Sequence, residues 1–151
     1  MPVPEAMAAK EKTQSVHREV LVGLKYIPDE KLDWCPMGKA KTPRHIGLEC
    51  AGAYKWGAAI IRGGPAEWPE AKDEDYPTRE AMVELLDASL AEFAAALDTV
   101  TEEQLNETRE VFWGQESVRN LLWINYWHSV YHAGQLNYIQ TMLGDTEMHM
   151  E

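Results

Sequence analysis

The spacing of hydrophobic residues predicts four helices in this chain of 151 residues. Apolar side chains recur every three or four residues over about 4–26, 43–61, 78–97 and 117–143, which is the period of a helix with a buried face. No alternating pattern is long enough to predict a sheet. We therefore expect an all-α protein in which residues 1–151 form a single domain, a four-helix bundle.

Local signals mark where the helices begin and end. Thr42 followed by Pro43 is typical of an N-cap and a first helical residue, and Thr78 precedes the third helix. The run Gly63-Gly64-Pro65 ends the second helix. The connection over 63–77 is long and contains three prolines, which favours a crossing of the bundle end over a tight hairpin.

The predicted last helix, over about 117–143, is apolar on both sides. One side carries two histidines and a glutamine among apolar residues: Leu121, Ile124, His128, Tyr131, His132, Gln135, Ile139 and Met142. The opposite side carries Leu122, Trp123, Tyr126, Val130 and Ala133. A helix that is apolar on both sides lies at the centre of a protein or at an interface.

We expect a homodimer through the second of these sides. Trp123, Tyr126 and Val130 lie about one turn apart, with Leu122 and Ala133 alongside. Exposed aromatic residues on a helix are typical of interface centres. The alternative is that the third helix or the Phe112-Trp113 segment covers this surface within one chain.

His128, His132 and Glu49 are the candidate metal ligands. The two histidines are one helical turn apart, so both rings can reach a common point. Glu49 interrupts the apolar face of the second helix, where a carboxylate is costly unless it is paired or bound to a cation. Two imidazoles and one carboxylate suit a divalent metal such as zinc, nickel or iron and leave positions for water or substrate. The alternative is a hydrogen-bonded core network without metal.

Three further residues are candidates to support these ligands or to replace one of them. His45 lies one turn before Glu49 on the second helix. Tyr131 and Gln135 share the helix face of the two histidines. Gln135 offers an amide that could orient a ligand, although it could equally satisfy a backbone group.

Composition narrows the choice of partners. The formal net charge is −11 and no basic run occurs, so we expect no nucleic-acid partner and no anionic membrane partner. No apolar run reaches the length of about 18 residues that a membrane span needs. Residues 1–13 lack the apolar core of a secretory signal, which predicts a cytoplasmic protein. Cys35 and Cys50 are isolated in the sequence and are expected to be reduced thiols.

Two stretches resemble the DinB/YfiT-like superfamily. The sequence H-S-V-Y-H-A-G-Q-L-N-Y-I-Q-T-M-L-G-D (128–145) is similar to its final helix, and I-P-D-E-K-L-D-W-C-P (27–36) with Thr42 is similar to the approach to its second helix. The resemblance implies helices in up-down-down-up order, commonly a homodimer. It also implies a metal held by one histidine of the second helix and two of the fourth, which His128 and His132 match.

The second helix departs from the family pattern. The family's histidine lies about two turns after the Thr or Ser that starts this helix. Counting from Thr42 places Glu49 there, and His45 one turn too early. Glu49 is therefore the first choice for the third ligand, and His45 is the alternative.

The resemblance also implies an activity. Members with known reactions are transferases and isomerases that use a low-molecular-weight thiol as cosubstrate for a small-molecule substrate. A bound metal would lower the pKa of such a thiol. Two alternatives stay open: metal-assisted hydrolysis, and a non-enzymatic protein that binds a small ligand or acts in a stress response.

Overall fold

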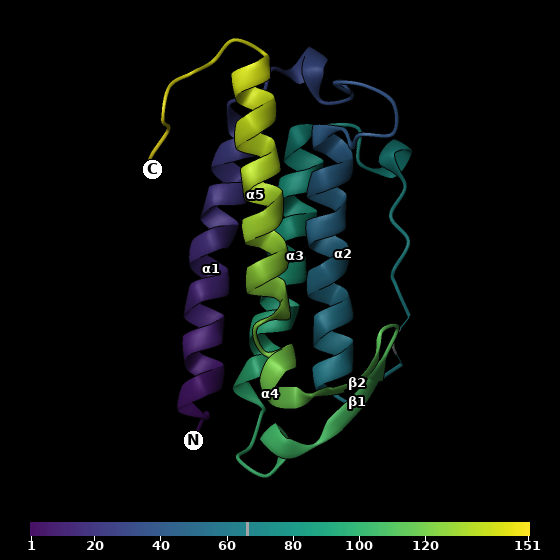
Figure 1. Cartoon of the computed structure of the whole chain (residues 1–151), viewed down its shortest axis with the longest axis vertical. Coiled ribbons are helices and arrows are strands. Elements are labelled where there is room, and N and C mark those ends of the chain that lie inside the picture. The colour runs from purple at the N-terminus through teal and green to yellow at the C-terminus, as the bar shows by residue number, and fades with distance from the viewer. Residues whose placement is uncertain (66) are drawn as a thin grey trace.

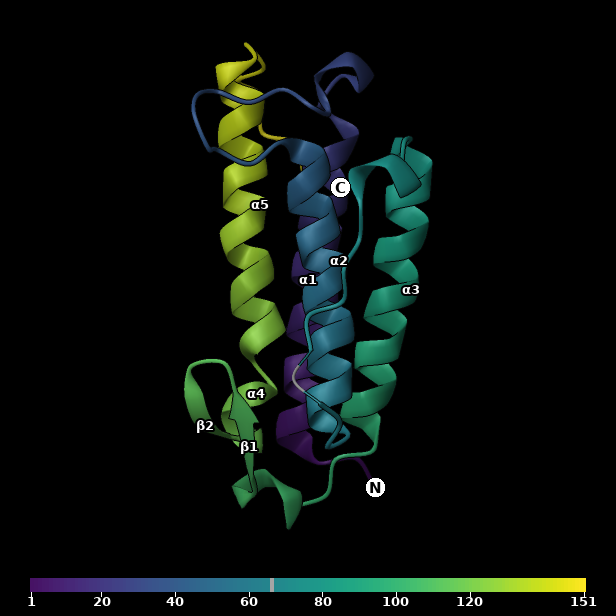
Figure 2. The same cartoon turned by 90° about the vertical axis from the view of Figure 1, so that its right-hand side faces the viewer.

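The computed structural model describes residues 1–65 and 67–151, and four long helices dominate it. They are α1 (Pro4–Lys25), α2 (Pro43–Ile61), α3 (Arg79–Asp98) and α5 (Ile124–Met142). Helices α1 and α5 run in one direction and α2 and α3 in the other (Figures 1 and 2). The prediction of an all-α, up-down-down-up four-helix bundle is confirmed. Among the described residues, no helix is long and apolar enough to cross a membrane.

Threonine caps fix the starts of α2 and α3 as predicted. The Thr42 Oγ1 accepts a hydrogen bond of 3.1 Å from the His45 amide, and the Thr78 Oγ1 accepts one of 3.1 Å from the Ala81 amide. Each bond satisfies an amide that has no partner within its own helix. After α2 the chain returns along the bundle before α3 begins, so the two helices run parallel (Figure 2).

The shorter elements lie at the two ends of the bundle. A small antiparallel hairpin corrects the expectation that the chain contains no sheet: Thr108 pairs with Ser117 and Val111 with Gly114. Each strand has four residues, which is too short for an alternating pattern to be recognised. The short elements at the two ends of the bundle are three 3₁₀ turns, η1 (Asp29–Lys31), η2 (Asp73–Asp75) and η3 (Gln104–Asn106), the strands β1 (Thr108–Val111) and β2 (Gly114–Ser117), and the single-turn helix α4 (Val118–Leu121).

The sequence predicted one continuous helix over about 117–143, and this prediction is wrong: the segment forms two helices, α4 and α5. Ser117 caps α4, its Oγ accepting a hydrogen bond from the Asn120 amide, and a turn at Leu122 and Trp123 precedes α5. Leu121 and Leu122 are both fully buried. Adjacent residues of a regular helix point about 100° apart, and the break lets both leucines reach the core.

The prediction that one side of the last helix is free to form a dimer interface is also partly wrong. Leu122 and Ala133 are buried in the core of their own chain, and Trp123 and Tyr126 are partly buried against it. Packing within the chain therefore covers much of this side. Val130 of this side stays exposed, and together with Trp127, Tyr131 and Tyr138 it forms an exposed strip of α5; Met142, the last residue of the helix, is exposed as well.

Two buried contacts hold α5 against α2. The Tyr54 hydroxyl and the Ser129 Oγ are hydrogen-bonded at 3.0 Å, and both residues are fully buried. One turn further along α2, Gly57 provides the space in which Asn125 of α5 and Phe93 of α3 pack. Three helices meet closely at this glycine because it has no side chain.

We expect Gly57→Ala to destabilise the protein. A Cβ at Gly57 would clash with the Asn125 Nδ2 and lie 3.0 Å from the Phe93 ring. Overpacking of this kind lowers the free energy of unfolding by about 1–3 kcal/mol, which urea denaturation would measure. Gly47→Ala on the same helix is the control, because its Cβ would lie 3.4 Å from the nearest atom, on Leu24. That variant should be neutral or more stable by up to about 1 kcal/mol. Equal stability of the two variants would contradict the expectation.

Candidate metal centre

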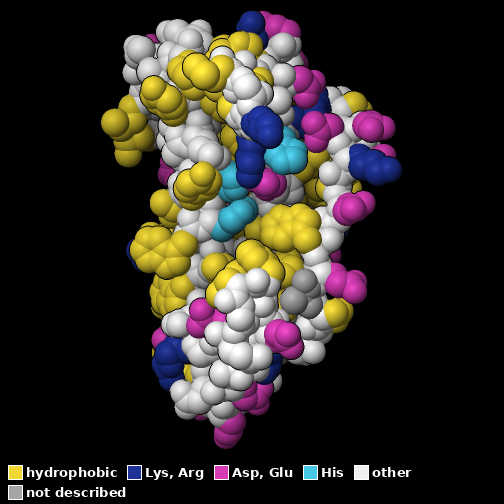
Figure 3. Space-filling view, turned by 45° about the vertical axis from the view of Figure 1, so that its right-hand side comes forward, with side chains coloured by type: hydrophobic (Ala, Val, Ile, Leu, Met, Phe, Trp, Pro, Cys, Tyr) yellow, Lys and Arg dark blue, Asp and Glu magenta, His cyan; other side chains and the backbone are white. Residues whose placement is uncertain are grey.

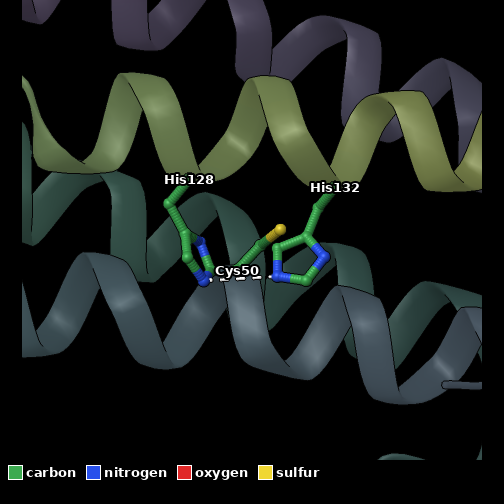
Figure 4. Close-up of side chains that lie close together, drawn as sticks. All are labelled: Cys50, His128 and His132. Carbon is green, nitrogen blue, oxygen red and sulfur yellow. Dashed lines mark hydrogen bonds between the residues drawn. The ribbon is translucent and has the colours of Figure 1, made fainter. Parts of the chain in front are cut away.

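His128 and His132 point from α5 toward α2, with their Nε2 atoms 3.2 Å apart (Figure 4). His132 is 1% exposed, and His128 is partly buried. Two nitrogens bound to the same tetrahedral zinc lie about 3.3–3.4 Å apart, since each Zn–N distance is about 2.0–2.1 Å. The separation of the two rings therefore fits a shared metal.

Gln135 fixes the orientation of the His132 ring. The Gln135 Oε1 lies 2.6 Å from the His132 Nδ1, and an amide oxygen can only accept, so Nδ1 carries the hydrogen. Burial, with smaller contributions from the charges of Lys41 and His45, lowers the pKa of His132 overall although Gln135 and Glu49 act to raise it, which favours the neutral ring. The lone pair of the His132 Nε2 then faces His128. A partner on the remote nitrogen is the usual support of a metal-binding histidine.

His128 is neutral at pH 7. Burial, followed by the neighbouring His132, lowers the pKa of His128 to about 4. Its Nδ1 is buried and has no hydrogen-bond partner among the described residues. The neutral ring binds a cation through Nε2 in the tautomer whose hydrogen lies on Nδ1, with no net loss of a proton.

Glu49 brings a carboxylate to the same place from α2. Its Oε2 lies 3.2 Å from the His132 Nε2 and 2.5 Å from the Lys41 Nζ, and about a quarter of the side chain is exposed. Burial works to raise the pKa of Glu49, but the hydrogen bond and charge of Lys41, with smaller contributions from His132 and His45, lower it overall. Glu49 is therefore ionised at pH 7.

These groups form an electron-rich centre. With the hydrogen of His132 on Nδ1, a nitrogen lone pair and a carboxylate oxygen face each other at 3.2 Å. Such a pair is unfavourable unless a cation lies between or beside the two atoms. The Lys41 ammonium supplies one positive charge at Glu49. A divalent metal between the imidazoles and the carboxylate would supply a larger one, so these side chains fit a metal.

Cys50 belongs to the same cluster, and the sequence analysis missed it. Its Sγ and one nitrogen each of His128 and His132 all lie within 4.8 Å of one another, and the sulfur lies between the two imidazoles in Figure 4. Burial raises the pKa of the Cys50 thiol. Because the sequence has no CxxC spacing, Cys50 was interpreted as an isolated reduced thiol and not as a metal ligand. Cys50 lies four residues after Ile46, which is buried, and residues at this spacing share a helix face. This spacing could have predicted that Cys50 faces the interior.

The other two candidates lie at the margin. The His45 Nε2 lies 3.5 Å from the Glu49 Oε1 and the ring is half exposed, so His45 contacts the carboxylate from the solvent side. Tyr131 packs its ring edge against His132 at a centroid distance of 5.2 Å but is 63% exposed. Among the three supporting candidates, Gln135 is the one that bonds to a histidine of the cluster.

A groove of about 530 Å³ adjoins the cluster. Two of its lining residues bond to the candidate ligands: Lys41 to Glu49, and Gln135 to His132. Figure 3 shows histidines gathered on this face of the molecule, with basic side chains above them and hydrophobic side chains below. The groove is lined by Pro36, Met37, Lys39, Ala40, Lys41, Ile46, Gln135, Tyr138, Ile139 and Met142.

The fold has close counterparts among solved structures. A DinB-like protein from Bacillus subtilis superposes with a TM-score of 0.75 at 18% identity, covering 95% of this chain and 96% of that protein. A conserved protein from Enterococcus faecalis superposes with a TM-score of 0.73 at 15% identity, covering 94% and 97%. At these identities the likeness shows the fold alone. No curated protein matches the chain.

The sequence itself carries a family signature that spans most of the bundle. The model of the DinB superfamily matches residues 11–136, which include α2, the hairpin and both candidate histidines. The chain therefore belongs to the DinB superfamily.

Proposed function

We propose that this protein is a divalent-metal-dependent enzyme that transfers or isomerises a small molecule with the help of a low-molecular-weight thiol. The observation that carries the proposal is a pair of neutral imidazoles 3.2 Å apart, one of which contacts the Glu49 carboxylate, beside a groove. Membership of the DinB superfamily supports it. The thiol cosubstrate follows from the family resemblance.

His128, His132 and Glu49 would hold the metal, and this set of nitrogen and oxygen ligands suits zinc, nickel or iron. The bound metal would lower the pKa of a thiol and so favour its thiolate form at neutral pH. Gln135 keeps the His132 Nε2 directed at the centre through the bond to Nδ1. His45 contacts the carboxylate and supports its position.

The groove next to the centre would bind the remainder of the reactants. Ile46, Ile139 and Met142 offer apolar surface, and Lys39 and Lys41 offer two positive charges in a protein of net charge −11. These features suit a small molecule with an apolar part and an anionic group. In a transfer reaction the thiol sulfur would form a new bond to carbon, the leaving group would depart with its electron pair, and the thiol proton would pass to solvent.

We expect the purified protein to bind about one divalent metal per chain, and His128→Ala to weaken binding at least about 100-fold. Loss of a residue that only supports a ligand already costs about 10–100-fold. Elemental analysis and isothermal titration with zinc would measure both. Metal at 100 times its Kd should also raise the free energy of unfolding of the wild type by about 2.7 kcal/mol. Metal content near zero after reloading, with unchanged melting, would contradict the metal site.

Two further variants test the choice of the third ligand. Glu49→Gln preserves the size of the side chain and removes the charge, so it should weaken zinc binding clearly. His45→Ala is the matched control on the same helix and should have a much smaller effect, because His45 contacts the carboxylate from outside. The reverse ranking would identify His45 as the ligand.

We expect the metal-loaded protein to accelerate the reaction of a low-molecular-weight thiol with an electrophile. Glutathione, cysteine and cysteine-derived thiols with monochlorobimane form a suitable first panel, read by fluorescence. Chelation and His128→Ala should each remove the acceleration, whereas Cys35→Ser should retain it. Metal-dependent ester hydrolysis without thiol transfer would favour the hydrolase, in which bound water replaces the thiol. Metal binding with neither activity across a broad panel would favour the ligand-binding alternative.

We also propose that the protein forms a homodimer through the exposed strip of α5. Trp127, Tyr131 and Tyr138 are each more than 60% exposed, and Val130 lies among them. Three large aromatic side chains exposed on one helix are typical of the centre of an interface. A stable interface of this kind buries on the order of 2,000 Å² in total.

We expect Trp127→Glu to convert the dimer to a monomer. A buried charge at the centre of an apolar interface has no partner and opposes association. Analytical ultracentrifugation at micromolar concentration would measure the change. Met7→Glu is the control, because Met7 is similarly exposed but lies on α1. A monomeric wild type, or equal dissociation in both variants, would contradict this interface.

A further inference from the structure

Cys50 and Glu49 are neighbours on α2, but they reach the histidine pair from different sides. Cys50 is fully buried, whereas the Glu49 side chain is 23% exposed. The Cys50 Sγ lies within 4.8 Å of both rings, and Glu49 contacts the His132 Nε2 at 3.2 Å. A metal bound by the two histidines would therefore have a thiol on its inner side and a carboxylate on its outer side.

The surroundings of the two cysteines differ. The Cys35 thiol donates to the Ala40 carbonyl at 3.1 Å, in the connection before α2. No hydrogen bond from the Cys50 sulfur is found among the described residues, and Figure 4 shows this sulfur directed between the imidazoles. Cys50 thus has its sulfur placed toward the candidate centre and available to bind there.

We infer that Cys50 is a metal ligand, and that the centre binds its metal through two imidazoles, the Cys50 thiolate and the Glu49 carboxylate. This inference rests on the proposed metal site. On binding, the sulfur–metal bond forms and the thiol proton passes to the buffer, so no oxidant or reductant is needed. Four protein ligands of this kind would surround a metal, which can expand to five-coordinate to take the thiol of the proposed reaction.

The thiolate determines which metals the centre prefers. Thiolate is a soft ligand that favours zinc, cobalt(II) and cadmium over magnesium and manganese, which prefer oxygen. A centre of two histidines and a carboxylate alone would discriminate less. Cys50 is therefore a specificity-determining residue for the metal, in addition to filling space in the core.

Cobalt(II) titration of the reduced, metal-free protein tests the inference without an activity assay. A thiolate bound to cobalt(II) gives an intense charge-transfer band in the near ultraviolet, and the visible d–d bands report binding by any ligand set. We expect both sets of bands in the wild type and in Cys35→Ser. Cys50→Ser should lose the charge-transfer band and bind cobalt(II) about tenfold more weakly or worse. Melting of the metal-free variant, compared with the wild type, verifies that it folds.

The outcomes separate this inference from the metal site itself. Visible bands without a charge-transfer band in the wild type would overturn the role of Cys50 and leave the metal site standing. Retention of the band in Cys50→Ser would overturn it as well. If Cys50→Ser does not fold, Cys50→Ala replaces it in the same titration. Absence of all cobalt bands in the wild type would overturn both the metal site and the Cys50 ligand.

Discussion

The candidate centre depends on the register of α2 against α5, and a buried hydrogen bond of 3.0 Å between Tyr54 and Ser129 fixes that register. Tyr54 lies one turn after Cys50 on α2, and Ser129 directly follows His128 on α5. Both hydroxyls are fully buried, and a helix shift that separated them would leave each without a partner. Each unpaired buried hydroxyl would cost about 1–3 kcal/mol. The bond therefore holds the side chains of the two helices opposite one another.

The electrostatic arrangement follows from this packing. Burial keeps both imidazoles neutral, while Lys41 keeps Glu49 ionised at the edge of the cluster. The resulting set of lone pairs and negative charge is matched to a cation, and the adjoining groove gives small molecules access to it. The same packing places Cys50 on the inner side of the histidine pair, where its thiolate would add a further ligand.

The solved structures that resemble this protein show how little sequence identity the fold requires. At 15–18% identity they share the bundle over nearly the whole chain. A bundle needs apolar residues of suitable size at inward positions, and many sequences satisfy that requirement. A metal site depends on the chemistry of a few side chains. On the α2 side of the centre, this protein offers Glu49 and Cys50. These two residues would make its chemistry differ from that of a centre built from histidines alone.

The sequence by itself determined the features that rest on local interactions. The caps at Thr42 and Thr78, the apolar faces of the helices and the one-turn spacing of His128 and His132 are all set by residues within a few positions of each other. The family resemblance added the order of the helices. The four-residue strands of the hairpin left no readable pattern.

Tertiary structure decided the rest, because contacts between distant segments settle what each side chain touches. Leu121 and Leu122 both reach the core only after the helix breaks, and Ala133 is covered by its own chain. Cys50 became part of the centre because α2 and α5 pack in one register among several that their apolar faces would allow. Helical periodicity gives the direction of a side chain on its own helix. The partner that it meets depends on the neighbouring helix, which no local pattern encodes.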